Sequence, residues 1–116
     1  MIRPADQARV YLEAVLETYS SLPGTPARAS RQDRRLAREL CRKGVPLRAV
    51  RAALILAAAR RTIRSGSPLP QVRTLHYFLP AIDEVLHHPL DPGYVEYLAA
   101  KLKPFASKKT ALLGER

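Results

Sequence analysis

The fold is decided by residues 46–64, which read PLRAVRAALILAAARRTIR. Within this stretch, residues 52–59 (AALILAAA) contain no polar side chain, so a helix formed by them is apolar on every side. Such a helix is buried among other helices. Pro46 suits a first helical position, and the glycine at position 44 suits the end of a preceding helix. We therefore expect residues 46–64 to form a helix buried at the centre of the domain.

Two further helices are predicted before this core helix. Pro4 suits a first helical position, and the apolar residues after it recur at helical spacing until the turn-rich residues 20–26. Ser30 is a suitable N-cap, and Asp33 three residues later completes a weaker form of the capping box. The second helix is expected over residues 30–43.

After the core helix, prolines indicate where helices begin and end. The proline that opens residues 80–88 would disrupt a helix interior, so we expect a turn at residues 75–79 and a helix over 80–88. Asp91 followed by a proline predicts the start of a helix that runs to about residue 103. Pro104 is expected to end that helix, because the residue before a proline disfavours helical geometry.

The sequence as a whole predicts an all-α fold. No stretch shows the alternation of a β-strand, no internal repeat is present, and 116 residues is a usual length for one domain. We expect a compact single domain of about five helices with a buried central helix. That domain is expected to span residues 1–103, and residues 104–116 are expected to form a flexible basic tail.

The composition excludes several classes of protein. Hydrophobic residues make up 47% of the chain and charged residues 26%, which is typical of a globular protein rather than a disordered one. One cysteine cannot build a disulfide framework, so the cytoplasm is the expected compartment. No apolar run approaches the ~18 residues of a membrane span, and residues 1–20 lack the pattern of a signal peptide.

The net charge of +10 is concentrated in the middle of the chain. Residues 28–73 hold thirteen Lys and Arg against two Asp and Glu, whereas the segments on either side are close to neutral. Twelve of those thirteen cations are arginine, whose planar guanidinium matches a phosphate or a carboxylate in a two-point contact. An arginine-rich genome would raise the number of arginines, but it would not cluster them.

Five arginines share one face of the predicted helix 30–43. They fall within an arc of about 100°, and Leu36, Ala37 and Leu40 occupy the opposite side. Only Asp33 and Glu39 could relieve the repulsion between these cations. A solvated face ordinarily mixes charges of both signs, and this one hardly does, so a phosphate-binding face is favoured over a merely solvated one. This arginine face consists of Arg31, Arg34, Arg35, Arg38 and Arg42.

The core helix carries five more arginines at its two ends, and we include them in the candidate nucleic-acid site. Arg48 and Arg51 lie near its start, whereas the three at its end also have a structural explanation, since cations favour a helix C-terminus. Residues 36–54 have the sequence pattern of a helix-turn-helix. Because the second helix is apolar, however, a plain helical hairpin is favoured over a helix-turn-helix that reads a DNA groove. The three arginines at the end are Arg60, Arg61 and Arg64.

No pattern in the sequence predicts an enzyme, a metal site or a cofactor. His87 and His88 are adjacent on a helix and point about 100° apart, so they cannot easily share one ion. Cys41 lies beside the apolar stripe of its helix and is expected to be a small core residue rather than a nucleophile. Glycine-rich phosphate loops and nucleophile-elbow motifs are missing from the sequence.

Four aromatic residues could stack on the bases of a single strand. In a domain with 6% aromatic residues, however, such side chains are more often core anchors, and this interpretation is favoured. Tyr94 and Tyr97 share one helix face, so one of them is expected to be buried and the other partly exposed. The four residues are Tyr77, Phe78, Tyr94 and Tyr97.

The order of these features resembles the small helical domains of DnaD/DnaT-like replication accessory proteins of phages and plasmids. The resemblance covers residues 30–88: a helix with Asp33, the turn Leu40-x-x-x-Gly44-Val45-Pro46, the pattern Val50-x-x-Ala53-Leu54-x-x-Ala57, and the segment Leu75-x-Tyr77-Phe78 with Ile82. The tryptophan that usually follows the tyrosine segment is absent here. The resemblance implies binding of single- or double-stranded DNA and contact with a replication or recombination protein.

Two hypotheses follow, and they belong to different classes. The first is a small basic nucleic-acid-binding accessory protein of a replication or mobile-element system, which contacts phosphates through the arginine face. DNA is favoured over RNA as its ligand. The alternative is a protein-interaction module, or a small helical subunit of a larger nucleoprotein assembly. Its basic face would meet an acidic partner or a nucleic acid already held by other subunits. Retention of an acidic protein that survives nuclease treatment would favour the alternative.

Overall fold

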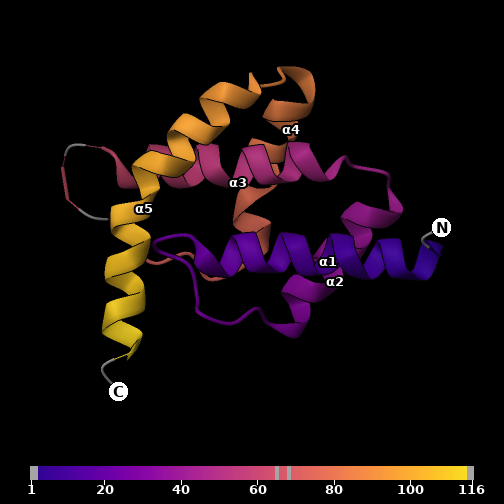
Figure 1. Ribbon diagram of the computed structural model, residues 1–116, viewed down its shortest axis with the longest axis horizontal. Coiled ribbons are helices and arrows are strands. Elements are labelled where there is room, and N and C mark those ends of the chain that lie inside the picture. Colours follow the sequence, from indigo (N-terminus) through magenta and orange to yellow (C-terminus); the bar gives the residue numbers. More distant parts are fainter. Residues whose placement is uncertain (1–2, 65, 68, 115–116) are drawn as a thin grey trace.

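Helix α3 (Leu47–Thr62) lies at the centre of the computed structural model, with other helices packed along its length (Figure 1). The structure describes residues 3–64, 66–67 and 69–114, and side chains up to residue 106. No strand occurs in this part of the chain, which confirms the all-α fold. The radius of gyration is 14.3 Å, close to the ~13 Å of a compact domain of this length. The other elements are α1 (Pro4–Ser21), α2 (Arg31–Arg42), the 3-10 helix η1 (Leu75–Phe78), α4 (Leu79–His87) and α5 (Pro92–Gly114).

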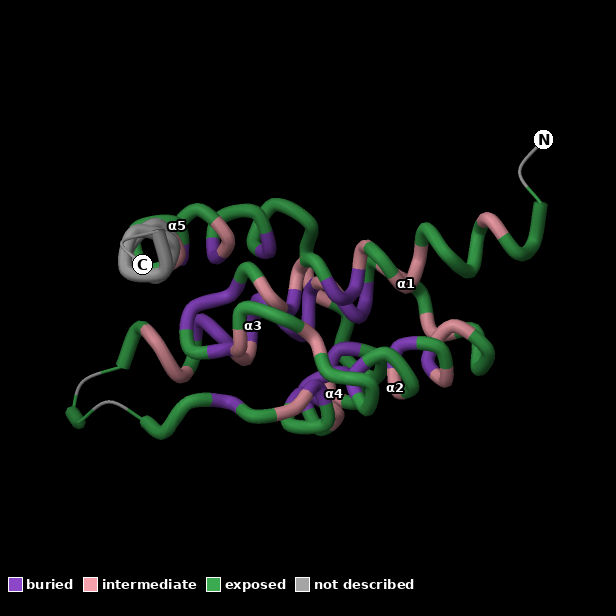
Figure 2. Tube along the Cα trace, turned by 90° about the horizontal axis from the view of Figure 1, so that it is seen from below, coloured by how far each residue is buried: buried purple, intermediate pink, exposed green. Residues whose placement is uncertain are grey.

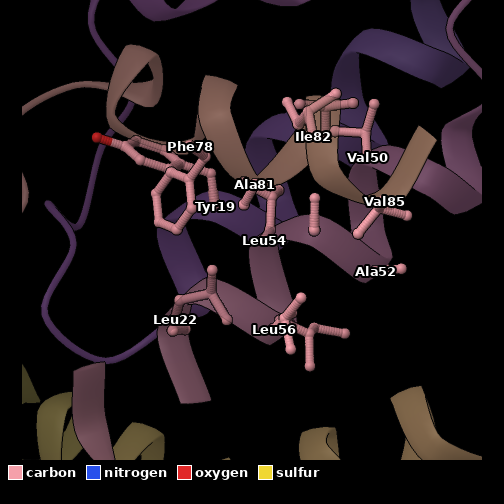
Figure 3. Close-up of a cluster of buried hydrophobic side chains, with 14 of the residues drawn as sticks. Tyr19, Leu22, Val50, Ala52, Leu54, Leu56, Phe78, Ala81, Ile82 and Val85 are labelled. Carbon is pink, nitrogen blue, oxygen red and sulfur yellow. The ribbon is translucent and has the colours of Figure 1, made fainter. Parts of the chain in front are cut away.

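Helix α3 is buried on nearly every side, as its apolar sequence predicts. It packs against α1, α4, α5 and η1. Its many alanines have short side chains, so the surrounding helices can approach its backbone closely, while Val50, Leu54 and Leu56 fill the spaces between them (Figure 3). The buried residues of α3 are Ala49, Val50, Ala52, Ala53, Leu54, Ile55, Leu56, Ala58 and Ala59.

Helix α1 contributes to the core only through its second half. Val15, Leu16 and Tyr19 are buried, whereas the first turns of the helix are exposed (Figure 2). The Tyr19 ring meets the ring of Phe78 edge-on, with 6.0 Å between the centroids. This aromatic contact joins α1 to the last residue of η1 and lies beside α3 in the core (Figure 3).

The turn between α2 and α3 is a complete Schellman motif around Gly44. The N–H of Val45 donates to the carbonyl of Leu40 at 3.1 Å, and the N–H of Gly44 donates to the carbonyl of Cys41 at 3.0 Å. Gly44 has a φ of +77°, a backbone conformation that residues with a Cβ rarely adopt. The predicted role of this glycine as a helix stop is confirmed. Val45 also accepts a hydrogen bond from the hydroxyl of Tyr11 at 2.7 Å, which attaches the turn to α1.

The segment before α4 is more regular than the expected turn. Residues Leu75–Phe78 form the 3-10 helix η1, which continues directly into α4 at Leu79. Pro80 lies in the first turn of α4, where its missing N–H costs nothing, because the first N–H groups of a helix have no partner within it. Helix α4 packs on the rest of the core through its buried residues Ala81, Ile82 and Val85.

The prediction that Pro104 ends the last helix is wrong. Helix α5 continues through this proline to Gly114, so residues 104–114 are helical. A proline inside a helix removes one hydrogen bond, here to the carbonyl of Ala100, and its ring pushes the helix axis aside. Figure 1 shows α5 changing direction along its length. The sequence predicts a flexible tail over residues 104–116, and the last two of these, residues 115–116, lie outside the described part of the chain.

Candidate nucleic-acid interface

Helix α2 begins with the capping box that the sequence predicts. The N–H of Asp33 donates to the Ser30 hydroxyl at 3.1 Å, and the N–H of Ser30 donates to Asp33 Oδ2 at 2.9 Å. Both residues therefore satisfy backbone donors that the first turn leaves without a partner. This reciprocal pair defines the start of the helix that carries the arginine face.

The second carboxylate oxygen of Asp33 reaches a different part of the chain. Oδ1 accepts a hydrogen bond from the N–H of Leu75 at 2.8 Å, and Asp33 is only 1% exposed. Because Asp33 is held inward by this contact, the opposite side of α2 is turned to solvent. Of the two acidic residues of α2, Asp33 directs its carboxylate into the protein, away from the arginines.

All five residues of the arginine face are exposed. Arg42 forms an ion pair with Glu39, with Nη2 and Oε2 2.6 Å apart. The hydrogen bond from Arg42 lowers the pKa of Glu39, and the same contact raises the pKa of Arg42. The other four arginines have no ion pair with any acidic side chain in the described part of the chain. These four are Arg31, Arg34, Arg35 and Arg38.

The unpaired arginines repel one another within α2. Arg31 is three residues from Arg34 and four from Arg35, and like charges at these spacings cost a few tenths of a kcal/mol each. Arg38 continues the same face one turn further along. A polyanion bound along this side would remove the repulsion and supply oxygen acceptors for four guanidinium groups.

The arginines at the start of α3 differ from those of α2 and from each other. Arg48 is exposed and has no acidic partner among the described residues, whereas Arg51 pairs with Glu96 of α5 at 2.8 Å. Arg51 is partly exposed, and its ion pair bridges α3 and α5 on the surface. The structure therefore leaves Arg48 available to an outside ligand and uses Arg51 to join two helices.

The arginines at the end of α3 are held by contacts within the protein. Arg60 makes a two-point contact with Glu84 of α4, at 2.8 and 2.6 Å. Arg61 donates to the carbonyl of Pro70, and Arg64 donates to the carbonyl of Ser67 at 2.7 Å. Among the described residues, the ten sequence-predicted arginines thus divide into five on α2, of which Arg42 alone has an ion pair, and five at the ends of α3, of which four are engaged.

The burial of α3 bears on the helix-turn-helix alternative. A recognition helix must expose one side along its length to enter a DNA groove. The middle of α3 is covered by α1, α4 and α5, and the exposed residues of this helix, Arg48 and Arg60, lie near its two ends. This burial argues against a helix that reads a DNA groove. The plain helical hairpin favoured by the sequence is not formed either, because α2 packs on α1 and η1 rather than on α3.

Three of the four aromatic residues correct the expectation of core anchors. Tyr94 and Tyr97 of α5 are 46% and 56% exposed, so neither is buried. Tyr77 is also exposed, whereas Phe78 is fully buried as expected. Sequence reasoning placed Tyr94 and Tyr97 on one helix face correctly, but their orientation depends on how α5 packs, which is determined by Val95, Leu98 and Leu102 on the adjacent side.

The histidine and cysteine side chains are in ordinary positions. His87 at the end of α4 contacts the carbonyl of Asp83 at 2.8 Å through Nδ1. Cys41 is half-buried as a free thiol beside the core. Across the described residues, no three His, Cys, Asp or Glu side chains come together as a metal site would require.

Comparisons with known proteins identify no relative of this chain. No family model, no curated protein and no solved structure matches it. Within the part of the chain that the structure describes, no helix combines the length and the apolar character needed to cross a membrane. The candidate interface therefore depends on the residues and contacts of this chain alone, and the DnaD/DnaT-like resemblance stays a prediction.

Proposed function

We propose that the protein binds nucleic acid by contacting the phosphate backbone with the arginine face of α2. The observation that carries this proposal is a contrast between two helices. Of the five arginines at the two ends of α3, four pair with Glu84, Glu96 or a backbone carbonyl, whereas four of the five on α2 face solvent without a carboxylate partner among the described residues. Guanidinium groups that already have protein partners gain little from a phosphate, and unpaired ones gain most.

The mechanism is electrostatic and independent of base sequence. Each phosphate that an arginine neutralises releases condensed counterions, and this release drives association. Phosphate contacts fix the position of the protein on the nucleic acid but carry no sequence information. DNA is the partner we favour, and a role in a replication or mobile-element system is the biological setting that the resemblance suggests.

The experiment that tests this proposal compares two variants with the same loss of charge. Arg31, Arg34 and Arg38 are changed to Ala in one variant, and Arg3, Arg9 and Lys103, which are exposed elsewhere, in the other. Binding to fluorescein-labelled duplex DNA, single-stranded DNA and RNA is measured by anisotropy at low salt. We expect the α2 variant to bind at least tenfold more weakly and the control variant to remain within threefold of the parent protein.

The alternative hypothesis of a protein-interaction module gives a different result. If the arginine face meets an acidic protein, the parent chain binds no oligonucleotide at low salt, and the α2 variant matches the control. An equal loss of affinity in both variants would contradict the assignment of binding to α2, because it would show that only net charge matters.

A further inference from the structure

A second surface of the molecule combines exposed tyrosines with cations at the C-terminal end of α3. Here Tyr94 and Tyr97 from α5 lie on one side of Arg60, and Tyr77 from η1 lies on the other side. We call this the tyrosine surface, and define it by Tyr77, Tyr94, Tyr97, Arg60, Arg64 and Lys101. None of its three tyrosines is needed to fill the core, since each is at least 46% exposed.

Two shallow grooves on this surface share Arg60. The groove between α3 and α5 has a volume of about 450 Å³ and is lined by Ile63, Tyr94, Tyr97 and Lys101 as well as Arg60. The groove between the end of α3 and the start of α4 has a volume of about 420 Å³. The latter contains Arg64 and Tyr77 beside Arg60. The tyrosines and cations are thus distributed along one continuous path.

The tyrosine rings of α5 are placed to receive flat ligands. The planes of Tyr94 and Tyr97 are 18° apart and their centroids are separated by 6.3 Å, so the two rings present faces of nearly the same orientation. The ammonium group of Lys101 lies 5.5 Å from the centroid of Tyr97. An exposed cation–π contact of this kind is weak and the lysine side chain is flexible, so a base can displace it from the ring.

The charges along the path favour an anionic ligand. Four cations line the two grooves against one carboxylate, that of Glu84, which Arg60 already holds. Arg61 is one of these cations, and its guanidinium carbon lies over the ring of Tyr77, 5.3 Å from the centroid. An apolar protein partner would not need this excess of positive charge beside the aromatic rings. Stacking faces alternating with cations are typical of surfaces that bind single-stranded nucleic acids.

We propose that the tyrosine surface binds single-stranded nucleic acid, with bases stacked on Tyr94 and Tyr97 and a phosphate held by Lys101 beside them. This inference rests on the proposed function only in that a nucleic acid is the ligand of both surfaces. Figures 1 and 2 both place α5 and α2 on different sides of the molecule. Bases in a duplex are stacked inside the helix and cannot reach the tyrosine rings, so this second surface gives a preference for single strands.

The test measures binding of a labelled twelve-nucleotide oligo(dT) and of a hairpin duplex of matched charge. Tyr94 and Tyr97 are changed together to Ala, and in a second protein to Phe, which keeps the aromatic face and removes only the hydroxyl. Loss of stacked bases predicts at least tenfold weaker binding of oligo(dT) by the Ala variant, with duplex binding within twofold. The Phe variant is expected to bind oligo(dT) as the parent protein does.

Several outcomes would overturn the inference. These are an unchanged affinity of the Ala variant for oligo(dT), an equal loss for oligo(dT) and duplex, or a changed oligomeric state in size-exclusion chromatography without a change in affinity. The last would identify a surface for self-association. The variant with Arg31, Arg34 and Arg38 changed to Ala separates the two proposals. If this variant binds both ligands normally and the Tyr94/Tyr97 Ala variant does not bind oligo(dT), binding by the arginine face is contradicted and binding by the tyrosine surface is supported. A parent protein that binds neither oligonucleotide would overturn both.

Discussion

The carboxylate of Asp33 accepts a hydrogen bond from the backbone N–H of Leu75 at 2.8 Å, across 42 positions of the sequence. The same side chain caps the first turn of α2 through Ser30. One buried carboxylate therefore starts the helix and fixes its rotation about its own axis. Asp33 lies on the side of α2 opposite the arginine face, so this contact acts together with the burial of Ala37 and Leu40 to direct the arginines outward.

Replacing Asp33 by Ala is expected to destabilise the protein by about 2–4 kcal/mol. The change removes the capping contact and leaves the N–H of Leu75 without an acceptor in the core. Urea unfolding followed by circular dichroism at 222 nm measures the free energy of unfolding. Glu39→Ala is the matched control, since Glu39 is an acidic residue of the same helix and its ion pair with Arg42 is on the surface. A loss for Asp33→Ala no larger than that for Glu39→Ala would contradict the role of this carboxylate.

Gly44→Ala is expected to cost about 1 kcal/mol of stability through the backbone alone. The positive φ of Gly44 disfavours a residue with a Cβ, and no other atom lies within 4 Å of where that Cβ would be placed. Gly44→Asn should cost less, since asparagine tolerates this conformation better. Thermal unfolding of the two variants checks the order. Equal melting temperatures for the parent protein and the Ala variant would show that the turn relaxes without strain.

Tyr11→Phe is expected to reduce stability by about 1 kcal/mol at pH 7, because it removes the hydrogen bond to the carbonyl of Val45. Burial raises the pKa of Tyr11 to about 12, above its usual 10.0. In the parent protein the neutral phenol therefore stabilises the fold fully below pH 10, and this contribution is lost as the pH rises towards 12. Tyr11→Phe has no hydroxyl that can ionise at this position, so it does not lose stability in this way as the pH rises.

Unfolding experiments between pH 7 and pH 11 measure this difference. The parent protein should lose stability above pH 10 more steeply than Tyr11→Phe does. Tyr97→Phe is the control, because the ring of Tyr97 is exposed, and it should follow the parent curve. Parallel curves for the parent protein and Tyr11→Phe would show that the Tyr11 hydroxyl ionises as it does in water.

The ion pair between α3 and α4 is expected to be visible in the titration of Glu84. The hydrogen bond from Arg60 lowers the pKa of this carboxyl below its ordinary value of 4.5. The contribution of Glu84 to stability is therefore present above pH 4.5 and is lost as the pH falls through the lowered pKa. In Arg60→Ala the pKa of Glu84 should rise towards 4.5, as measured by carbon-13 NMR of the side-chain carboxyl. An unchanged pKa in this variant would show that the pair does not persist in solution.

Local patterns in the sequence predict those parts of the structure that depend on neighbouring residues. The apolar run of residues 52–59 indicates the buried helix, Ser30 with Asp33 indicates the capping box, and Gly44 indicates the turn after it. In each case the partner lies within about four positions, so helical periodicity is enough to identify it. The composition of the arginine face is predictable for the same reason.

The remaining features depend on contacts between distant parts of the chain. Glu84 and Glu96 neutralise Arg60 and Arg51 across 24 and 45 positions, and no local pattern pairs them. The exposure of Tyr94 and Tyr97 is likewise decided by how α5 packs on α3. The course of the chain at Pro104 differs from its prediction because a proline weakens a helix without always ending it. Sequence patterns therefore predict which residues form the basic face of α2. The structure is needed to separate these arginines from Arg51 and Arg60 of α3, which join helices.

The salt dependence of DNA binding is the most direct test of phosphate binding by the arginine face, because it counts phosphate contacts. If the protein engages about six phosphates, the logarithm of its affinity for duplex DNA should fall against the logarithm of salt concentration with a slope near −5. Changing Arg31, Arg34 and Arg38 to Ala should reduce the size of this slope by about 2 to 3, since each lost contact removes about 0.9. The control variant at Arg3, Arg9 and Lys103 should keep the parent slope. A parent slope near −1, or the same slope in both variants, would contradict phosphate binding by the arginine face of α2.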